Sequence, residues 1–181
     1  MGKFSVSKKE VQMLTPDYYY NSVFEIPYKR LHEKKIRGLI FDVDNTLTPF
    51  HQKLPPAKVV ALMKHLQKMG FEICLLTNNT TTRLNGFNAE MKLNGIANGL
   101  KPFTRGIRRA MSIMGTAKAE TVIIGDQLLS DIWGGKNAGI TTIMVKPITE
   151  KDFFFVRFKR IIENFMLRDY FVKIGKRGNA R

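Results

Sequence analysis

The hydrophobic positions between residues 38 and 146 alternate between short apolar runs and longer amphipathic stretches. The apolar runs predict buried strands, at residues 39–43, 71–76, 96–100, 121–124 and 141–145. The amphipathic stretches predict helices, at residues 57–69, 82–93, 105–114 and 130–138. Pro56 before the first helix and Gly70 after it are typical of a helix start and end. Such alternation favours an α/β fold, a Rossmann-like three-layer sandwich with a mainly parallel sheet.

Polar residues follow four of these strands at the point where each strand ends. In chain order they are Asp42, Asp44, Thr77, Asn78, Lys101, Asp126 and Asp131. Ligands of an open α/β sheet bind outside the carboxyl ends of its strands, so we expect these side chains to converge on one crevice. Asp42 and Asp44 lie two residues apart and therefore face the same way. Their mutual repulsion predicts a cation, a shared proton, or both.

These residue types suit a phosphate ester and a divalent cation. The carboxylates of Asp42, Asp44 and Asp126 are hard oxygen ligands of the kind that Mg²⁺ prefers, and Mg²⁺ shares its shell with substrate phosphate. Lys101 supplies a point charge for a phosphate oxygen, and Thr77 supplies a hydroxyl donor. One carboxylate of such a site can attack phosphorus. A second can protonate the leaving oxygen and later deprotonate water.

The stretches "DVDNT", "TNN", "KP" and "GDQLLSD", in this order, resemble the four motifs of the haloacid dehalogenase (HAD) superfamily of phosphatases with an aspartate nucleophile. The resemblance covers residues 38–146. It implies a HAD-like fold, an aspartyl-phosphate intermediate and Mg²⁺ as cofactor. It also implies that Asp42 is the nucleophile and a metal ligand, and that Asp44 is the general acid/base and binds the metal through its backbone carbonyl.

The same resemblance assigns the remaining residues. Thr77 and Lys101 would hold the phosphoryl group, and the backbone N–H of Asn78 would add a further donor. Asp126 would be the metal ligand of the last motif, and Asp131 would orient the metal's waters. The sequence also allows Asp131 to be a residue of a first helical turn without a role in metal binding.

The lead-in "PDYYYNSVFEIPYKRLHEKKIRGLIFDVDNTL" and the stretch "GDQLLSDIWGGKNAGI" are similar to the YqeG group of HAD subclass IIIA. This similarity covers nearly the whole chain and implies dephosphorylation of phosphatidylglycerophosphate, a lipid at the membrane surface. The gaps between the motifs leave no room for a cap domain. We therefore expect one capless domain over residues 1–181, with its core at 38–146 and basic, aromatic-rich flanks at 1–37 and 147–181.

Charge and cysteine content indicate the kind of binding partner and the cellular compartment. The net charge is +15, of which residues 1–37 and 151–181 carry +10, and this favours an anionic partner such as a membrane surface or nucleic acid. Cys74 is the single cysteine, so no disulfide can form within one chain and a reducing cytoplasm is expected. No apolar run approaches the length of a membrane span, so membrane contact would be peripheral, at the inner face.

Several alternatives stay open on the sequence alone. Residues 151–181 show a broad apolar stripe with Lys and Arg elsewhere, which suits packing on the sheet, a partner, or an anionic bilayer. The same phosphatase chemistry could act on a nucleic-acid end or on a small soluble ester. A non-enzymatic RNA- or ribosome-binding protein is a third option, against which the complete motif set argues. An oligomeric neighbour, like a large substrate, could exclude water from an uncapped site.

Overall fold

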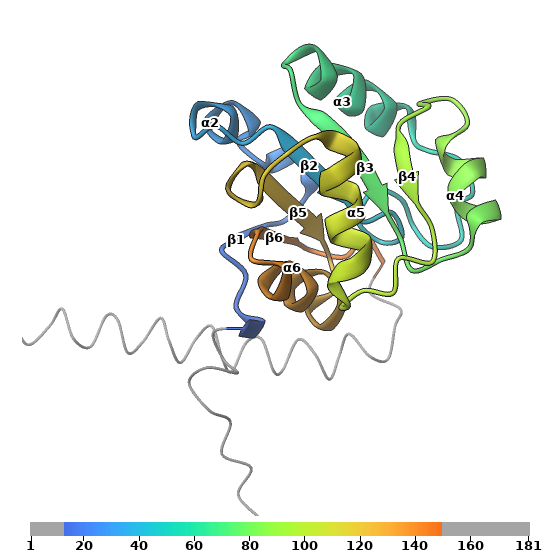
Figure 1. Ribbon diagram of the computed structural model, residues 1–181. Coiled ribbons are helices and arrows are strands. Elements are labelled where there is room, and N and C mark those ends of the chain that lie inside the picture. Colours follow the sequence, from blue (N-terminus) through green and yellow to red (C-terminus); the bar gives the residue numbers. More distant parts are fainter. Residues whose placement is uncertain (1–12, 150–181) are drawn as a thin grey trace, which may run out of the picture. The chain divides into compact units, whose positions relative to one another are not determined.

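Figure 1 shows a computed structural model of the chain, which describes residues 13–149. Its centre is a six-stranded sheet in the order β1-β6-β5-β2-β3-β4, and each neighbouring pair is parallel. In chain order the strands are β1 (Tyr18–Tyr20), β2 (Gly38–Phe41), β3 (Glu72–Leu76), β4 (Asn94–Ile96), β5 (Thr121–Gly125) and β6 (Thr141–Val145). The predicted α/β class with a mainly parallel sheet is confirmed.

Helices cover both faces of the sheet (Figure 1). The longer ones are α2 (Tyr28–Glu33), α3 (Ala57–Lys68), α4 (Thr81–Asn88), α5 (Thr104–Met114) and α6 (Trp133–Ala138). Shorter turns are η1 (Val23–Glu25), η2 (Lys118–Glu120) and η3 (Leu128–Ile132), the last of which has π-helical hydrogen bonding.

Alternation of side chains along the strands builds two cores. Leu39 and Phe41 of β2 face the core formed with α2, α3 and α4, whereas Ile40 between them faces the core formed with α5 and α6. This is the two-residue period of a strand that is buried on both faces. Cys74 lies fully buried in β3, as expected of a small hydrophobe.

Two predicted boundaries were wrong around the second crossover. The helix expected at 82–93 ends at Asn88, because the Asn88 side chain bonds both the N–H (3.0 Å) and the carbonyl (2.6 Å) of Leu93 and closes a turn. The strand expected at 96–100 lies at Asn94–Ile96 instead. Asn98 and Leu100 have positive φ, which ends the extended backbone after Ile96.

The amino-terminal flank contributes directly to the sheet and the core. Tyr18–Tyr20 pairs with β6 and forms one edge of the sheet, while Val23 and Leu31 are buried in the α2–α4 core. Packed structure therefore begins well before the core expected at 38–146. Residues 13–148 belong to one compact unit. The predictions for the tail at 151–181, and hence for one domain over the whole chain, lie outside the described residues.

No helix within residues 13–149 has the length and apolar character needed to cross a bilayer.

Two helical glycines offer a matched test of the packing beside the loop after β4. A Cβ on Gly106 of α5 would lie 2.6 Å from the backbone oxygen of Gly99, whereas a Cβ on Gly86 of α4 would meet nothing within 4 Å. We expect Gly106→Ala to lower the free energy of unfolding by ~1–3 kcal/mol through overpacking. Gly86→Ala should raise it by ~0.5–1 kcal/mol through helix propensity. Chemical denaturation of both variants measures this, and equal stability of the two would contradict it.

Candidate active site

Lys101 lies at the centre of the site, between two carboxylates. Its Nζ donates to Oδ1 of Asp42 and to Oδ1 of Asp131, both at 2.6 Å, and to the carbonyl of Leu76 at 2.8 Å. These three bonds use all the donors of the ammonium group. Burial alone would lower the pKa of Lys101, but the charges of Asp131 and Asp42 raise it above its ordinary value. Lys101 is therefore a permanent buried cation that fixes both carboxylates.

The loop that carries Lys101 is tied to the loop after β3. The backbone N–H of Lys101 donates to Oδ1 of Asn78 (2.7 Å), and Nδ2 of Asn78 donates back to the Lys101 carbonyl (2.9 Å). The N–H of Gly99 donates to the Thr77 carbonyl at 2.9 Å. The side chain of Asn78 thus positions Lys101. The backbone N–H of Asn78 remains the group that we expect to contact phosphate.

Three buried carboxylates meet beside Lys101. Asp42, Asp126 and Asp131 each offer an oxygen within 4.8 Å of the others, a grouping that could hold a metal ion. The hydroxyl of Thr46 donates to Oδ1 of Asp126 at 2.8 Å. The N–H of Gln127 donates to Oδ2 of Asp131 at 3.1 Å. Oδ2 of Asp42 is buried and has no hydrogen-bond partner among residues 13–149.

The electrostatics of this cluster favour the binding of a cation. Burial raises the pKa of Asp42 to about 7, against the opposing charge of Lys101 and with the help of Asp131. Burial also raises the pKa of Asp126 to about 8, and the neighbouring carboxylates of Asp42 and Asp131 add to the shift. Buried carboxylates are destabilised in their charged form unless an opposite charge comes close. The unpartnered buried oxygen of Asp42 is open to a further partner.

Asp44 lies in a separate network centred on Arg83. Oδ1 of Asp44 accepts from Nε (3.1 Å) and Nη2 (2.9 Å) of Arg83, and Oδ2 accepts from Nδ2 of Asn79 at 3.2 Å. Nη1 of Arg83 donates to the carbonyl of Lys53 at 2.8 Å. Arg83 therefore links Asp44 to the loop that follows β2. The Thr77 hydroxyl completes the network, since it donates to Oδ2 of Asp44 at 3.5 Å and accepts from the N–H of Asn79 at 3.0 Å.

All seven predicted residues therefore lie at the carboxyl edge of the sheet, in two adjoining groups. The side chain of Asp44 stands apart from the carboxylate cluster, and its expected use of a backbone carbonyl as metal ligand stays a prediction. Sequence reasoning missed Arg83 and Asn79 altogether. Arg83 did carry one signal: it lies in the first turn of α4, where the helix dipole disfavours a cation. Ser130, whose hydroxyl accepts from Asn78 at 3.5 Å, had no such signal.

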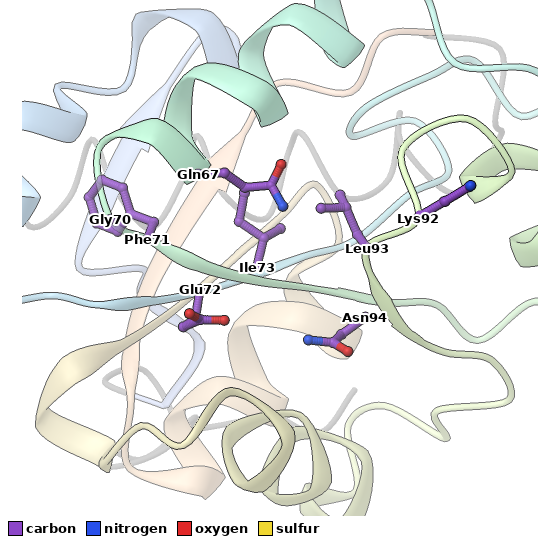
Figure 2. Close-up of a pocket in the computed structure, with 8 residues that line it drawn as sticks. All are labelled: Gln67, Gly70, Phe71, Glu72, Ile73, Lys92, Leu93 and Asn94. Atoms are coloured by element: carbon purple, nitrogen blue, oxygen red, sulfur yellow. The ribbon is translucent and has the colours of Figure 1, made fainter.

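A second hollow lies away from this site, at the amino ends of β3 and β4 (Figure 2). It has a volume of about 230 Å³ and is lined by Gln67, Gly70, Phe71, Glu72, Ile73, Lys92, Leu93 and Asn94. None of the seven predicted residues lines it. Its position at the opposite edge of the sheet separates it from the carboxylate cluster.

Sequence comparisons identify phosphatases as relatives. The HAD-hydrolase-like family model matches residues 100–147. The probable phosphatase YqeG of Bacillus subtilis is 31% identical over 84% of this chain and 88% of its own length. Phosphatidylglycerophosphate phosphatase 1 of Arabidopsis thaliana is 23% identical over 96% of this chain. The chain spans only 53% of that plant protein, about half of its length.

Comparison with solved structures supports the fold. An uncharacterized protein from Listeria monocytogenes aligns with a TM-score of 0.52 and 18% identity, over 65% of this chain and 84% of that one. NagD from Escherichia coli aligns with a TM-score of 0.50 and 16% identity, over 64% and 90%. At these identities the similarity concerns the fold alone, and it agrees with the layered parallel sheet. The similarity to the Bacillus protein, which extends over most of both chains, shows the family. The chain belongs to the YqeG family of HAD-superfamily phosphatases, hydrolases that act on phosphate monoesters.

Proposed function

We propose that the chain is a Mg²⁺-dependent phosphatase that forms an aspartyl-phosphate on Asp42, and that its substrate is phosphatidylglycerophosphate. The observation that carries the proposal is the state of the Asp42 carboxylate. Lys101 holds Oδ1 at 2.6 Å, whereas Oδ2 is buried without a partner among the described residues. The first oxygen is fixed and the second keeps its lone pairs, which is what a nucleophile requires.

The chemistry divides between Asp42 and Asp44. Oδ2 of Asp42 forms a bond to phosphorus while the bond from phosphorus to the leaving oxygen breaks, and Asp44 donates the proton that this oxygen takes up. In the second step water attacks the phosphorus of the aspartyl-phosphate, Asp44 accepts its proton, and the Asp42 carboxylate is released. Arg83 and Asn79 hold the two oxygens of Asp44 in a defined orientation for both steps.

The donor set fits a divalent cation by chemistry and by charge. Asp42, Asp126 and Asp131 would hold it, with the backbone carbonyl of Asp44 as a further ligand. Three carboxylates and the Lys101 ammonium leave two negative charges uncompensated, which equals the charge of one divalent ion. Oxygen ligands alone select Mg²⁺ over softer metals. When bound, Mg²⁺ neutralises the phosphoryl oxygens and orients them for displacement. Thr77 and the N–H of Asn78 would contact the same phosphoryl group, and the positive charge of Lys101 would attract it.

Support for the lipid substrate comes from relatives and from charge. Proteins named phosphatidylglycerophosphate phosphatases in Arabidopsis thaliana and Chlamydomonas reinhardtii align with 96% and 90% of this chain. A net charge of +15 suits the anionic inner face of a membrane, where we place the enzyme as a peripheral protein. The non-enzymatic alternative is not retained, because the chain belongs to a phosphatase family. A nucleic-acid end or a small ester remains the competing substrate, and a homo-oligomer remains a prediction.

Phosphate release from four substrates tests the choice. They are phosphatidylglycerophosphate in detergent micelles, glycerol 3-phosphate, a nucleoside monophosphate and a 5′-phosphorylated oligonucleotide, assayed at equal concentration. The lipid should give the highest kcat/KM. A higher value for the oligonucleotide, with a steep dependence on salt, would replace the lipid by nucleic acid and leave the phosphatase chemistry intact.

The Asp42→Asn variant tests the nucleophile. An amide cannot attack phosphorus, so turnover should fall to background while the far-ultraviolet circular dichroism spectrum stays unchanged. Phosphate release at an appreciable fraction of the wild-type rate by a folded Asp42→Asn protein would exclude the covalent mechanism.

Metal exchange tests the cofactor. Activity should vanish in excess chelator, return with Mg²⁺, and be inhibited by Ca²⁺. Mg²⁺ demands near-octahedral geometry, whereas Ca²⁺ accepts more ligands and can take both oxygens of Asp42, which blocks attack. Full activity in excess chelator would show that no divalent ion is needed.

The pH dependence of stability tests the carboxylate cluster without any turnover. Asp42 and Asp126 have folded-state pKa values of about 7 and 8, above the unfolded value of roughly 4. Between these limits the folded state binds more protons, so the free energy of unfolding of the metal-free protein should fall as pH rises, by several kcal/mol between pH 5 and pH 9.

Two controls sharpen this stability measurement. Asp126→Asn should flatten the decline, because the variant lacks one of the two titrating groups. Added Mg²⁺ should stabilise the protein more at pH 8 than at pH 5, since protons compete with the metal for the same oxygens. Denaturant titrations at each pH give the values, and a free energy of unfolding that rises toward pH 9 without metal would contradict the assignment.

A further inference from the structure

The five most exposed large apolar side chains of residues 13–149 gather around the active site. Their exposed fractions run from 50% to 72%, and they are Phe50, Leu54, Leu100, Phe103 and Leu129. Four of them lie on the loops that leave the carboxyl ends of β2 and β4, and Leu129 lies in η3, which follows β5. These strands are parallel and therefore open toward one edge of the sheet. We name this set the apolar rim.

Each chain segment that contributes to the rim also holds a residue of the active site. Leu100 directly precedes Lys101, and Leu129 lies two positions before Asp131. Leu54 follows Lys53, whose carbonyl accepts the hydrogen bond from Arg83. The rim is thus built from the same chain segments that position the catalytic residues, and its side chains are exposed beside them in the sequence.

Leu100 breaks two local rules at once. Its φ is +52°, in the left-handed region that a leucine seldom adopts. Its side chain is 64% exposed, so burial does not offset the backbone strain. Residues that carry such strain without a packing gain mark functional sites. Here the strained residue is the one that leads directly into Lys101.

We propose that the apolar rim is the surface by which the enzyme docks on an anionic bilayer, so that a lipid phosphomonoester enters the site from the membrane. This inference rests on the proposed lipid substrate. Whatever covers the rim also covers the phosphoryl site, so the covering surface must itself supply the phosphate. A bilayer of phosphorylated lipid does both, whereas a protein partner or a second copy of the chain would close the site without delivering substrate.

The composition of the rim fits the boundary between acyl chains and headgroups. Phe and Leu side chains insert at this boundary, and flanking cations attract anionic headgroups. Lys53 lies beside Leu54, and Arg105 lies two positions after Phe103; both cations are exposed. The location differs from the tail at 151–181, for which the sequence left membrane contact as one of several options, and it would bring the bilayer to the active site itself.

Vesicle binding by the full-length protein tests this inference. The probe is co-sedimentation with phosphatidylcholine vesicles that do or do not contain phosphatidylglycerol. The rim variant is Leu54→Ser/Phe103→Ser, and the matched control is Phe24→Ser/Ile113→Ser, which removes two apolar side chains exposed by 42% and 43% on other parts of the surface. Wild type and control should bind anionic vesicles alike, and the rim variant at least about tenfold more weakly. Thermal unfolding establishes that both variants are folded.

The depth to which the rim inserts into the bilayer provides a second measurement, which does not depend on the folding of the double serine variant. Phe103→Trp should gain emission that is quenched by brominated lipid in the vesicles, whereas Ile113→Trp should not; the wild-type signal of Trp133 is subtracted in both cases. Equal vesicle binding by rim variant and wild type, or no quenching of the Phe103→Trp signal, overturns the proposal. A wild-type dimer that the rim variant abolishes, without vesicle binding, overturns it as well and makes the rim an interface between copies.

The lipid substrate and the rim can fail separately. Phosphate release from the lipid in detergent micelles depends on the chemistry and not on a bilayer. If wild type is inactive there, the proposed substrate is wrong and the docking proposal falls with it. If wild type is active there while its vesicle binding does not depend on the rim, only the docking proposal is overturned.

Discussion

The ammonium group of Lys101, buried between Asp42 and Asp131, is the interaction on which the site depends. A cation taken out of water is costly unless its partners are close and its donors are satisfied, and here two carboxylates and the Leu76 carbonyl satisfy all three. Removing the lysine would leave buried carboxylates without their counter-charge. The same ion pairs connect the segments that follow β2, β4 and β5. They therefore both position the catalytic groups and hold this edge of the sheet together.

Parallel strand topology explains why so much of the site could be predicted from the sequence. Each strand ends at the same edge, so polar residues that follow successive apolar runs must approach one another whatever the details of the helices between them. Seven residues chosen on this ground do lie at that edge, three of them in one carboxylate cluster. The continuous apolar runs predicted the layers for a similar reason, because a strand that is buried on both faces is apolar throughout.

What could not be predicted depends on side chains that act across loops. The contact between Arg83 and Asp44 requires the orientation of α4 relative to the loop at Lys53, which no local pattern encodes. The end of α4 depends on one asparagine side chain, Asn88, that competes with the backbone for hydrogen bonds. The apolar run at 96–100 looked like a strand because Ile96 and Leu100 are apolar, but Leu100 turns out of the sheet into a left-handed conformation.

Several features that lower stability gather at the carboxyl edge. The carboxylates there repel each other, one buried oxygen of Asp42 lacks a partner among the described residues, and Leu100 combines strain with exposure. The core beneath shows the opposite, with Leu39, Ile40 and Phe41 fully buried in regular strands. Stability supplied by the core therefore supports an edge that is poised for binding. A cation would relieve the carboxylates and a bilayer would cover the exposed rim, so both defects are relieved by the ligands that the proposed reaction needs.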